Sequence, residues 1–377
     1  MTKMRYVQIN SFCNGSTGSI MHELHREALE RGDESWMFWG RGHLDAEVAH
    51  GVDFATAPGV CADAALTRLD GRAGFHSMAA TRRLLARLDE IDPDVVHLHN
   101  VHGYYVNIEM LFGWLARSRC QVRWTLHDCW AFTGHCAYFT YAKCAQWQSR
   151  CAREKPCPQL DTYPKTYSKR ACARNFEDKK RLFTSVPPER MTLITPSQWL
   201  ADLLADSFLA AYPVEVRHNT IDTSVFKPAP SDFREHYGIG NRFMVLGVAG
   251  TWSDRKGLPD FLRLARELDS ERFAVVLVGL GKRQVRALPE GVVGLERTES
   301  AGELAGVYSA ADVFFNPTLE DNFPTVNLEA EACGTPVVTY DVGGCAETIA
   351  RGDSVAVAGY DEAVAVMRHL WEARGLL

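Results

Sequence analysis

Residues 313–339 read VFFNPTLEDNFPTVNLEAEACGTPVVT, and this stretch carries the pattern that decides the fold. The apolar run Val313–Asn316 is typical of a buried strand. A helix is expected from about Pro324, because proline suits a first helical turn, and Gly334 is suited to end it. The next apolar run, Pro336–Thr339, indicates another strand. A strand, a helix and a second strand in succession predict an α/β fold.

Outward from this stretch, short apolar runs alternate with helical patterns along almost the whole chain. In the first half the expected strands are Arg5–Ile9, Ser35–Trp39, Asp94–Leu98, Val122–Leu126, Thr192–Thr195 and Val214–Arg217. The other strands expected in the second half are Phe243–Val248, Phe273–Val278 and Val292–Leu295. This alternation predicts two Rossmann-like, doubly wound parallel sheets that face a central cleft.

The predicted domain boundaries follow from a change of sequence pattern near Tyr212–Pro230, where the regular alternation of strands and helices stops. We interpret this stretch as the linker. Residues 1–217 are expected to form an N-terminal domain with a cysteine-rich insert at about 129–160. Residues 218–360 are expected to form the C-terminal domain. Residues 361–377 are expected to form a terminal helix that packs back toward the first domain.

The composition narrows the class of protein. The 377 residues carry 41 basic and 47 acidic side chains, and the net charge of −6 argues against nucleic-acid binding through global charge. No signal peptide is evident, and no stretch approaches the roughly 20 apolar residues of a membrane-spanning helix. Eleven cysteines without a secretion signal indicate reduced thiols or metal ligands rather than disulfides. We therefore expect a cytoplasmic protein, which is either free in the cytoplasm or bound peripherally at the inner face of the membrane.

Polar groups with a chemical use gather around the helix that begins near Pro324. The free N–H groups at a helix start bind phosphate. Asp321 precedes the helix and Glu329 lies in its second turn, so both are expected to face the same end of the sheet. Their carboxylates would accept hydrogen bonds from sugar and ribose hydroxyls. Glu320 and Glu331 are interpreted as ordinary surface acids.

These residues resemble the E-x7-E motif of the family-4 retaining glycosyltransferases, which have the GT-B fold. Asp321 stands at the first acid, as a shorter replacement for the usual glutamate, and Glu329 stands at the second. The local form from Glu320 to Pro324 is similar to that of enzymes that build colanic-acid-type and capsular polysaccharides. The resemblance implies that Glu329 contacts the ribose. The contacts it implies for the donor sugar are Asp321, Asn322, Phe323 and Pro324.

A second stretch, GTWSDRKGL at 250–258, follows a strand and resembles the family's phosphate loop. Lys256 fits the family's lysine, which would stabilise the departing diphosphate without a metal. The family's arginine position holds Thr251, so Arg255 is either its replacement or a solvated neighbour. Gly279, just past another strand, lies where the nucleotide base would pack.

In the N-terminal half the resemblance assigns two residues to the site. Gly18 ends the small-residue loop 15–18 and would face the donor phosphates and the acceptor. His127 directly follows a strand and would contact the donor sugar. The loop does not match G-x-G-x-x-G, so a dinucleotide site is not expected. His97 and His99 are interpreted as structural.

Two features of this half each leave two interpretations open. The insert carries Cys136, Cys144, Cys151 and Cys157, which form either a tetrahedral structural zinc site or a set of buried or free thiols. The segment Lys165–Arg181 is rich in basic residues with interleaved aromatic ones. It forms either a basic amphipathic helix on an anionic membrane surface or a solvated helix face. Membrane contact would suit a polyprenyl-diphosphate-linked acceptor.

Taken together, the resemblance implies a hexosyltransferase with retention of anomeric configuration. It would move a hexose from a nucleoside diphosphate sugar to a hydroxyl of an oligosaccharide, free or lipid-linked, in the synthesis of bacterial capsule or exopolysaccharide. His127, Lys256 and Asp321 would be catalytic, and no cofactor would be required. The first domain would be the acceptor side and the second would bind the nucleotide sugar. The alternatives are a glycosidase, a two-domain nucleotide-sugar epimerase, a phosphorylase-like enzyme and a zinc-dependent binding module without activity.

Overall fold

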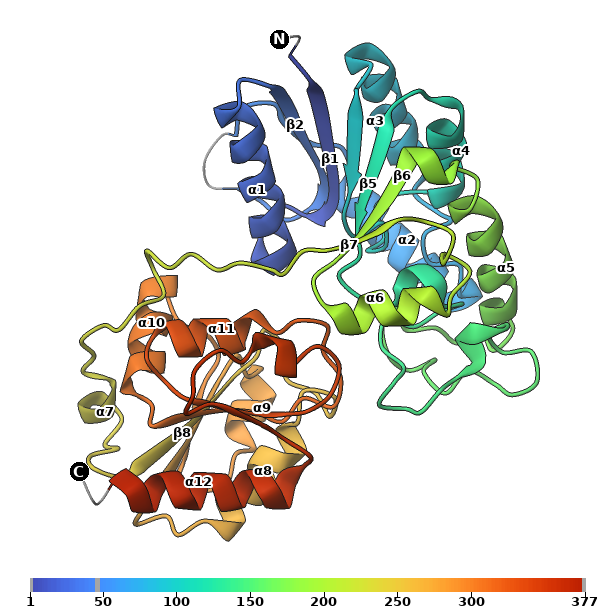
Figure 1. Ribbon diagram of the computed structural model, residues 1–377. Coiled ribbons are helices and arrows are strands. Elements are labelled where there is room, and N and C mark those ends of the chain that lie inside the picture. Colours follow the sequence, from blue (N-terminus) through green and yellow to red (C-terminus); the bar gives the residue numbers. More distant parts are fainter. Residues whose placement is uncertain (1–2, 45–47, 375–377) are drawn as a thin grey trace. The chain divides into compact units, whose positions relative to one another are not determined.

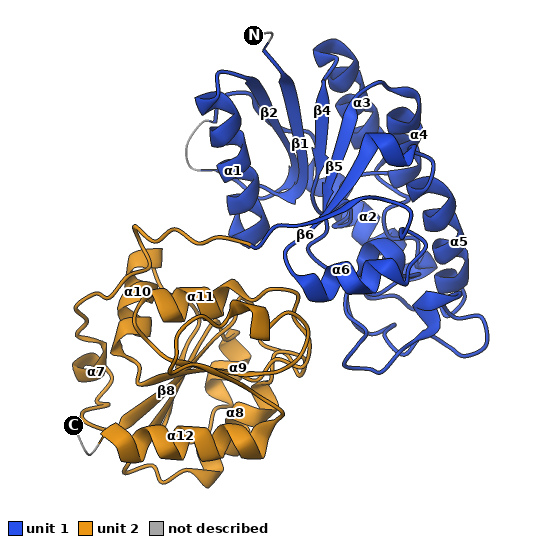
Figure 2. Ribbon diagram, in the orientation of Figure 1, with its two compact units in different colours: residues 1–218 blue, residues 219–377 orange. Residues whose placement is uncertain are grey.

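The structure is a computed structural model that describes residues 3–44 and 48–374. The chain forms two compact units, residues 1–218 and 219–377 (Figure 2). Each unit is an α/β layer structure with its own hydrophobic core.

The first unit is built on one seven-stranded sheet. Its strands, in spatial order, are β3 (Gly51–Asp53), β2 (Glu34–Arg41), β1 (Arg5–Phe12), β4 (Val95–Leu98), β5 (Gln121–Thr125), β6 (Met191–Thr195) and β7 (Val214–Val216). Every strand pair that the structure describes here is parallel. The helices are α1 (Gly15–Glu30), α2 (Ala57–Asp70), α3 (Met78–Ile91), α4 (Ile108–Arg117), α5 (Ala171–Phe183) and α6 (Gln198–Ala205). Helix α1 covers one side of the sheet, and α3 and α4 cover the other (Figure 1).

The second unit repeats this plan with a six-stranded parallel sheet. Its strands, in spatial order, are β10 (Val292–Leu295), β9 (Phe273–Val278), β8 (Phe243–Val248), β11 (Val313–Asn316), β12 (Val337–Tyr340) and β13 (Val355–Val357). The helices are α7 (Phe233–His236), α8 (Leu258–Glu267), α9 (Lys282–Arg286), α10 (Ala301–Ala310), α11 (Thr325–Ala332) and α12 (Tyr360–Arg374).

The strand period of two explains why helices cover both faces of this second sheet. In β9, Phe273, Val275 and Leu277 join one core cluster, which includes residues of α8 and α12. The alternate residues, Ala274 and Val276 among them, join the cluster that includes residues of α10 and α11. The prediction of two doubly wound Rossmann-like sheets is confirmed.

The terminal helix α12 is held by its own unit. Its buried residues Ala363, Val364 and Met367 belong to the core of the second unit, and the helix contacts β12 and β13. The sequence predicts residues 361–377 as a separate segment, because an amphipathic terminal helix does not reveal which core takes its apolar side.

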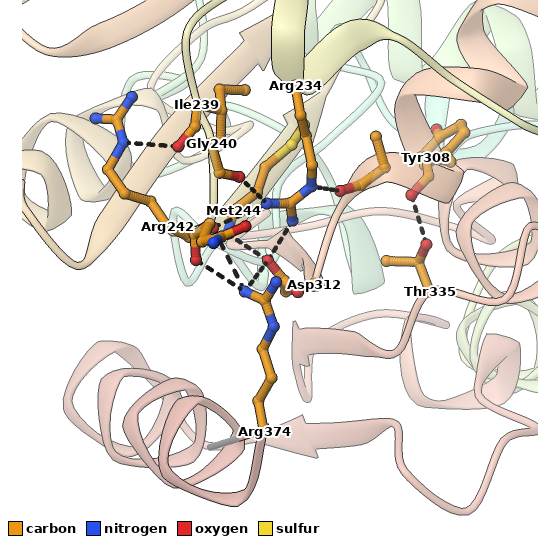
Figure 3. A network of polar contacts seen from close by, with 11 residues as sticks. Arg234, Ile239, Gly240, Arg242, Met244, Tyr308, Asp312, Thr335 and Arg374 are labelled. Carbon is orange, nitrogen blue, oxygen red and sulfur yellow. Dashed lines mark hydrogen bonds and ion pairs between the residues drawn. The ribbon is translucent and has the colours of Figure 1, made fainter. Parts of the chain in front are cut away.

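An ion-pair network closes the amino-terminal edge of this second sheet (Figure 3). Asp312 precedes β11 and accepts hydrogen bonds from Arg234 at 2.5 Å, from the backbone N–H of Met244 at 2.7 Å and from Arg374 at 3.1 Å. Arg234 also donates to the backbone oxygen of Ala310 at 2.7 Å. One carboxylate therefore joins α7, β8 and α12.

Asp312→Ala is expected to lower the free energy of unfolding by about 2 kcal/mol, because it removes the carboxylate that accepts from one Arg234 N–H and from the strand N–H of Met244. Urea denaturation followed by circular dichroism measures this change. The matched control is Asp361→Ala, which removes an ion pair with Arg263 at 3.2 Å on an exposed surface. We expect a much smaller loss there, because solvent screens exposed ion pairs. Equal losses in the two variants would contradict a special role for Asp312.

Candidate active site

Two loops meet at the carboxyl edge of the second sheet. One follows β8 and the other follows β11, and these two strands are hydrogen-bonded neighbours. The Lys256 ammonium donates to the Asp321 carboxylate across the two loops, and the Arg255 guanidinium donates to the backbone oxygen of Glu320. The backbone N–H of Leu319 donates to the Arg255 oxygen at 2.7 Å. The structure thus brings Lys256 and Asp321, two of the predicted catalytic residues, into direct contact.

The charge state of Asp321 follows from this contact. Burial acts to raise its pKa, but attraction to Lys256 and Arg255, with hydrogen bonds from Lys256 and the Asn322 N–H, lowers it overall. The N–H of Asn322 donates to the second carboxylate oxygen at 2.9 Å. Asp321 is therefore an ionised carboxylate that fixes the position of the Lys256 ammonium.

Gly343 explains how the chain clamps this acid. Its φ is +60°, and a Cβ there would lie 2.0 Å from the backbone oxygen of Asp321. The next residue, Gly344, donates its N–H to that same oxygen at 3.0 Å. Only glycine allows the turn to approach so closely.

Glu329 lies on α11 and is mostly buried. It accepts a hydrogen bond from the Tyr308 hydroxyl at 2.9 Å, and burial raises its pKa. Asn327 of the same helix bonds Asn316 of β11 at 2.9 Å and Thr348 at 2.8 Å. These buried bonds fix α11 on the sheet, with Pro324 at its N-cap position and its first turn at the carboxyl edge.

The structure corrects the interpretation of Glu320 as a surface acid. Glu320 is fully buried, as is Thr318, whose hydroxyl donates to the Glu320 backbone oxygen at 3.2 Å. The loop after β11 turns inward beneath the Arg255 loop, so an acid in it cannot reach solvent. The same geometry shows that Arg255 is half-buried and tied to this loop rather than a solvated neighbour.

The other residues of the second unit that were predicted to bind the donor lie at the same edge. Asn322 and Phe323 are buried in the loop between β11 and α11. Gly279 follows β9 with a φ of +96°, and a Cβ there would lie 1.7 Å from the backbone oxygen of Ala249. Gly279 therefore lets the end of β9 approach the end of β8, where a larger residue could not fit.

In the first unit, three histidine rings form a stack near the carboxyl ends of β4 and β5. The rings of His97 and His99 are 4.7 Å apart, and those of His99 and His127 are 5.5 Å apart. Each has a polar neighbour, with 2.8 Å between His97 and Thr125 and 3.2 Å between His99 and His127. Burial lowers the pKa of His97 to about 3 and that of His127 to about 4. His127 is half-buried and neutral near pH 7, so it serves as a hydrogen-bonding group rather than a cation.

Three more polar side chains, those of His102, Asp128 and Tyr163, lie next to the histidine stack. The His102 ring lies 3.0 Å from the Asp128 carboxylate and 2.9 Å from the Tyr163 hydroxyl. Burial acts to raise the pKa of Asp128, but His102 and the Trp130 N–H lower it overall. His102, His127 and Asp128 line one small cavity. The sequence signal for His102 was its place among the histidines 97, 99 and 102 near the end of an expected strand, but nothing in the sequence indicated that Tyr163, which follows the insert, returns to it.

Gly18, the other site residue predicted in the first unit, lies in the first turn of α1. The sequence predicts a loop through residue 18, whereas the helix begins at Gly15. Asn14 stands at its N-cap position, and the Asn10 amide donates to the Thr17 hydroxyl at 3.2 Å, which supports that first turn. Gly18 is therefore a buried helical residue rather than part of a loop.

The cysteines of the insert share one small cavity with His135. Cys157 interacts with Cys136 and with Cys172 of α5, a fifth thiol that spacing alone did not include, while Cys151 accepts the Gly134 N–H at 3.1 Å. Within residues 3–44 and 48–374, no group of three or more His, Cys, Asp or Glu side chains is arranged to hold a metal ion. The thiols thus lie close together in the structure, and the two interpretations of the insert, a structural zinc site or a set of buried or free thiols, both stay predictions.

The basic segment Lys165–Arg181 is not one amphipathic helix. Helix α5 begins only at Ala171, and Lys179 on it is buried, where its ammonium donates to the backbone oxygens of Trp130 at 2.7 Å and Thr133 at 3.0 Å. Other bases of α5 form ion pairs, such as Arg181 with Glu109 at 3.2 Å. The exposed bases that precede the helix are Lys165, Lys169 and Arg170.

Two models of known protein families match this chain. A family model described as Glycosyltransferase Family 4 matches residues 17–225, and one described as Glycosyl transferases group 1 matches residues 242–372. The chain belongs to the family-4 glycosyltransferases. Among the residues that the structure describes, no helix has both the length and the apolar character needed to cross a bilayer.

Curated family members show partial similarity. A putative colanic acid biosynthesis glycosyl transferase, WcaC of Escherichia coli, is 28% identical over 211 residues, which cover 53% of this chain and 50% of that protein. A D-inositol 3-phosphate glycosyltransferase of Corynebacterium jeikeium is 28% identical over 308 residues, which cover 75% of this chain and 65% of the relative. The chain thus matches between half and two thirds of the length of these relatives.

Solved structures share the GT-B fold of this glycosyltransferase family. Sucrose-phosphate synthase of Thermosynechococcus elongatus superposes with a TM-score of 0.70 at 15% identity, covering 99% of this chain and 90% of that one. HepE of Anabaena, solved in complex with UDP-glucose, gives 0.64 at 16% identity, covering 99% and 91%. These similarities establish the fold.

The buried histidines predict a pH dependence of stability. In the folded chain His97 and His127 have pKa values of about 3 and about 4, against an ordinary value of 6.5. Between those values and 6.5 the unfolded chain binds more protons, so the free energy of unfolding should decrease as the pH falls from 6.5 toward 4. Above that range these groups should contribute no slope.

Urea denaturation across this pH range measures the effect, with the double variant His97→Asn and His127→Asn beside the wild type. The variant should lose part of the slope. Identical slopes in both proteins would contradict the assignment of two neutral histidines.

Proposed function

We propose that this chain is a retaining hexosyltransferase that uses a nucleoside diphosphate sugar. The observation that carries the proposal is the contact between Lys256 and Asp321 at the carboxyl edge of the second sheet. It holds a cation beside the start of α11, and both favour the negative charge of a diphosphate. HepE, a structural neighbour, has been solved with UDP and with UDP-glucose, which supports a donor of this class.

In the proposed reaction, an acceptor hydroxyl attacks the anomeric carbon from the face that the diphosphate leaves. The bond from that carbon to the diphosphate oxygen breaks, the new glycosidic bond forms, and the hydroxyl proton passes to a departing phosphate oxygen. Lys256 and the N–H groups of α11 stabilise the leaving group, so no metal and no side-chain nucleophile are needed. Asp321, with the backbone of Asn322–Pro324, orients the sugar, and Glu329 accepts a ribose hydroxyl.

The same proposal assigns roles to the other residues. Arg255 acts as the second cation and Gly279 gives room for the base. In the first unit, Gly18 faces the donor phosphates and the acceptor, and neutral His127 bonds a hydroxyl of the transferred sugar. Residues 1–217 then form the acceptor side, and residues 218–360 bind the donor.

The acceptor is proposed to be an oligosaccharide linked to a polyprenyl diphosphate, in the synthesis of a surface polysaccharide in the cytoplasm. The similarity to WcaC, named for colanic acid biosynthesis, supports this class of product. An epimerase or a phosphorylase-like enzyme would turn over the donor when no oligosaccharide acceptor is present, whereas the proposed transferase needs an acceptor hydroxyl.

Lys256→Ala is expected to lower kcat/KM for transfer by about a hundredfold or more, because the leaving diphosphate loses its fixed cation. A coupled assay of nucleotide release in the presence of acceptor measures this. The matched control is Arg266→Ala, which removes an exposed cation of α8 in the same unit and should retain full activity. Undiminished transfer by a folded Lys256→Ala enzyme would contradict the proposed function.

A further inference from the structure

A connected group of aromatic and basic side chains lies at the carboxyl edge of the first sheet. Phe12 ends β1 and Arg41 ends β2, and the two residues are register partners in neighbouring strands. The Arg41 guanidinium carbon lies 4.4 Å from the centre of the Phe12 ring and 5.9 Å from that of Tyr104. The Tyr104 ring is in turn 5.9 Å from the Tyr163 ring, with 71° between the two planes. We call this set the edge group, and its members, all at least partly exposed, are Phe12, Arg41, Tyr104 and Tyr163.

The backbone of Tyr104 has a conformation that a bulky residue rarely adopts. Its φ is +69°, and the residue before it, Gly103, has a φ of +118°. Tyr104 is also the one residue of 101–107 that is not buried. A left-handed backbone at a tyrosine costs free energy, and strain of this kind is concentrated at functional sites. The loop after β4 thus accepts strain and brings one aromatic ring to the edge of the sheet.

The edge group carries positive charge. Within residues 3–44 and 48–374, the contacts of Arg41 are the two ring faces and the backbone oxygen of Gly103, to which it donates at 3.4 Å. Burial raises the pKa of the Tyr104 hydroxyl overall, and Arg41 and Arg68 both oppose this rise. Asp63, which also acts on that hydroxyl, already accepts hydrogen bonds from two hydroxyl groups. A guanidinium has five N–H donors, so Arg41 retains donors for a planar acidic group.

The edge group lies where an open parallel sheet binds its ligand. In the spatial order, β1 has β2 on one side and β4 on the other, so the direction in which strands are added reverses there. Such sheets bind ligands beyond the carboxyl ends of their strands at this reversal. The Tyr163 hydroxyl is 2.9 Å from His102, which lines a small cavity together with His127. A sugar on the edge group would therefore lie close to the histidine that is proposed to bond the transferred sugar.

The side chains of the edge group match one class of ligand. The C–H face of a pyranose packs on aromatic rings, and its hydroxyls bond polar groups such as the tyrosine hydroxyls. A neutral sugar would leave Arg41 without an anionic partner, whereas a phosphate alone would leave the rings unused. A uronic acid has both a C–H face and a planar carboxylate, which suits the forked guanidinium.

We propose that the edge group binds the acceptor and selects a sugar that carries a carboxylate. The sugar ring would pack against Tyr104 and Tyr163, and Arg41 would bind the carboxylate. This inference rests on the proposed function, because it concerns the acceptor of that reaction. It goes further by naming the class of acceptor, which is an oligosaccharide that presents a uronic acid.

Ligand-observed NMR titrations of the full chain with octyl glucuronide and octyl glucoside test the proposal, because the two probes differ only in the carboxylate. We expect the glucuronide to bind at least about tenfold more tightly. Arg41→Gln should abolish this preference and change the affinity for the glucoside by less than about twofold. Tyr104→Asn should weaken both probes by about fivefold, since asparagine tolerates the left-handed backbone but lacks the ring.

The matched control is Arg31→Gln at the other end of β1. The Arg31 guanidinium carbon lies 5.6 Å from the centre of the Tyr6 ring, so it repeats the arrangement of an arginine over a ring away from the edge group. This variant should bind both probes as the wild type does. Circular dichroism of each variant verifies that it is folded.

Three results would overturn the proposal. The first is equal affinity of the wild type for the two glycosides, or binding of neither. The second is a preference for the glucuronide that persists in Arg41→Gln. The third concerns octyl phosphate, an anion without a sugar ring. If it binds in a way that depends on Arg41 but not on Tyr104, the group at this site is a phosphate rather than a sugar acid.

Calorimetry of nucleotide binding on the same samples keeps the two proposals apart. Nucleotide binding without a preference for the glucuronide would reject the acceptor site and leave the proposed function standing. A preference for the glucuronide without nucleotide binding would reject the proposed function instead.

Discussion

The ion pair between Lys256 and Asp321 is the interaction on which the proposed donor site depends. It joins the loop after β8 to the loop after β11, and it forms because these strands are parallel neighbours whose carboxyl ends share one edge. Other contacts hold the two partners of this ion pair in place. Gly343 approaches the Asp321 backbone, and Asn327 holds α11 against β11. An ammonium fixed in this way needs little reorganisation when a diphosphate forms beside it.

The first unit uses burial for a different purpose. There, desolvation keeps His97 and His127 uncharged, whereas in the second unit the attraction between opposite charges outweighs desolvation and keeps Asp321 ionised. A neutral edge is suited to sugar hydroxyls and a charged edge to a diphosphate. The two units thus share one fold but differ in the electrostatics of the edge that carries their candidate residues.

The sequence predicted the fold where its signals are local. Long apolar runs such as Phe273–Val278 are strands in the structure, and the proline and glycine around α11 mark its ends closely. The strands β3 and β13, each three residues long at the edge of its sheet, were missed, whereas the equally short edge strand β7 was predicted. Helix α1 begins before Gly18, which spacing did not reveal.

The candidate site was predictable only in part, because motifs name residues but not their partners. The pattern indicated Lys256 and Asp321, yet not that they bond each other. Glu320 and Lys179 are buried, although charged residue types predict exposure to solvent. The sequence does not show that the loop of Glu320 and the helix side of Lys179 face the interior. The return of Tyr163 to His102 arises from tertiary contacts that no local pattern shows.

The central claim is that Lys256 and Asp321 act as one unit toward the donor diphosphate. A double-mutant cycle with Lys256→Ala and Asp321→Asn tests it most directly. Calorimetry would follow the tightest binder among UDP, GDP and ADP. If the pair acts as one unit, the two losses of binding free energy are not additive, with a coupling of about 1 kcal/mol or more. Strict additivity, or unchanged affinity in the Lys256 variant, would contradict the account.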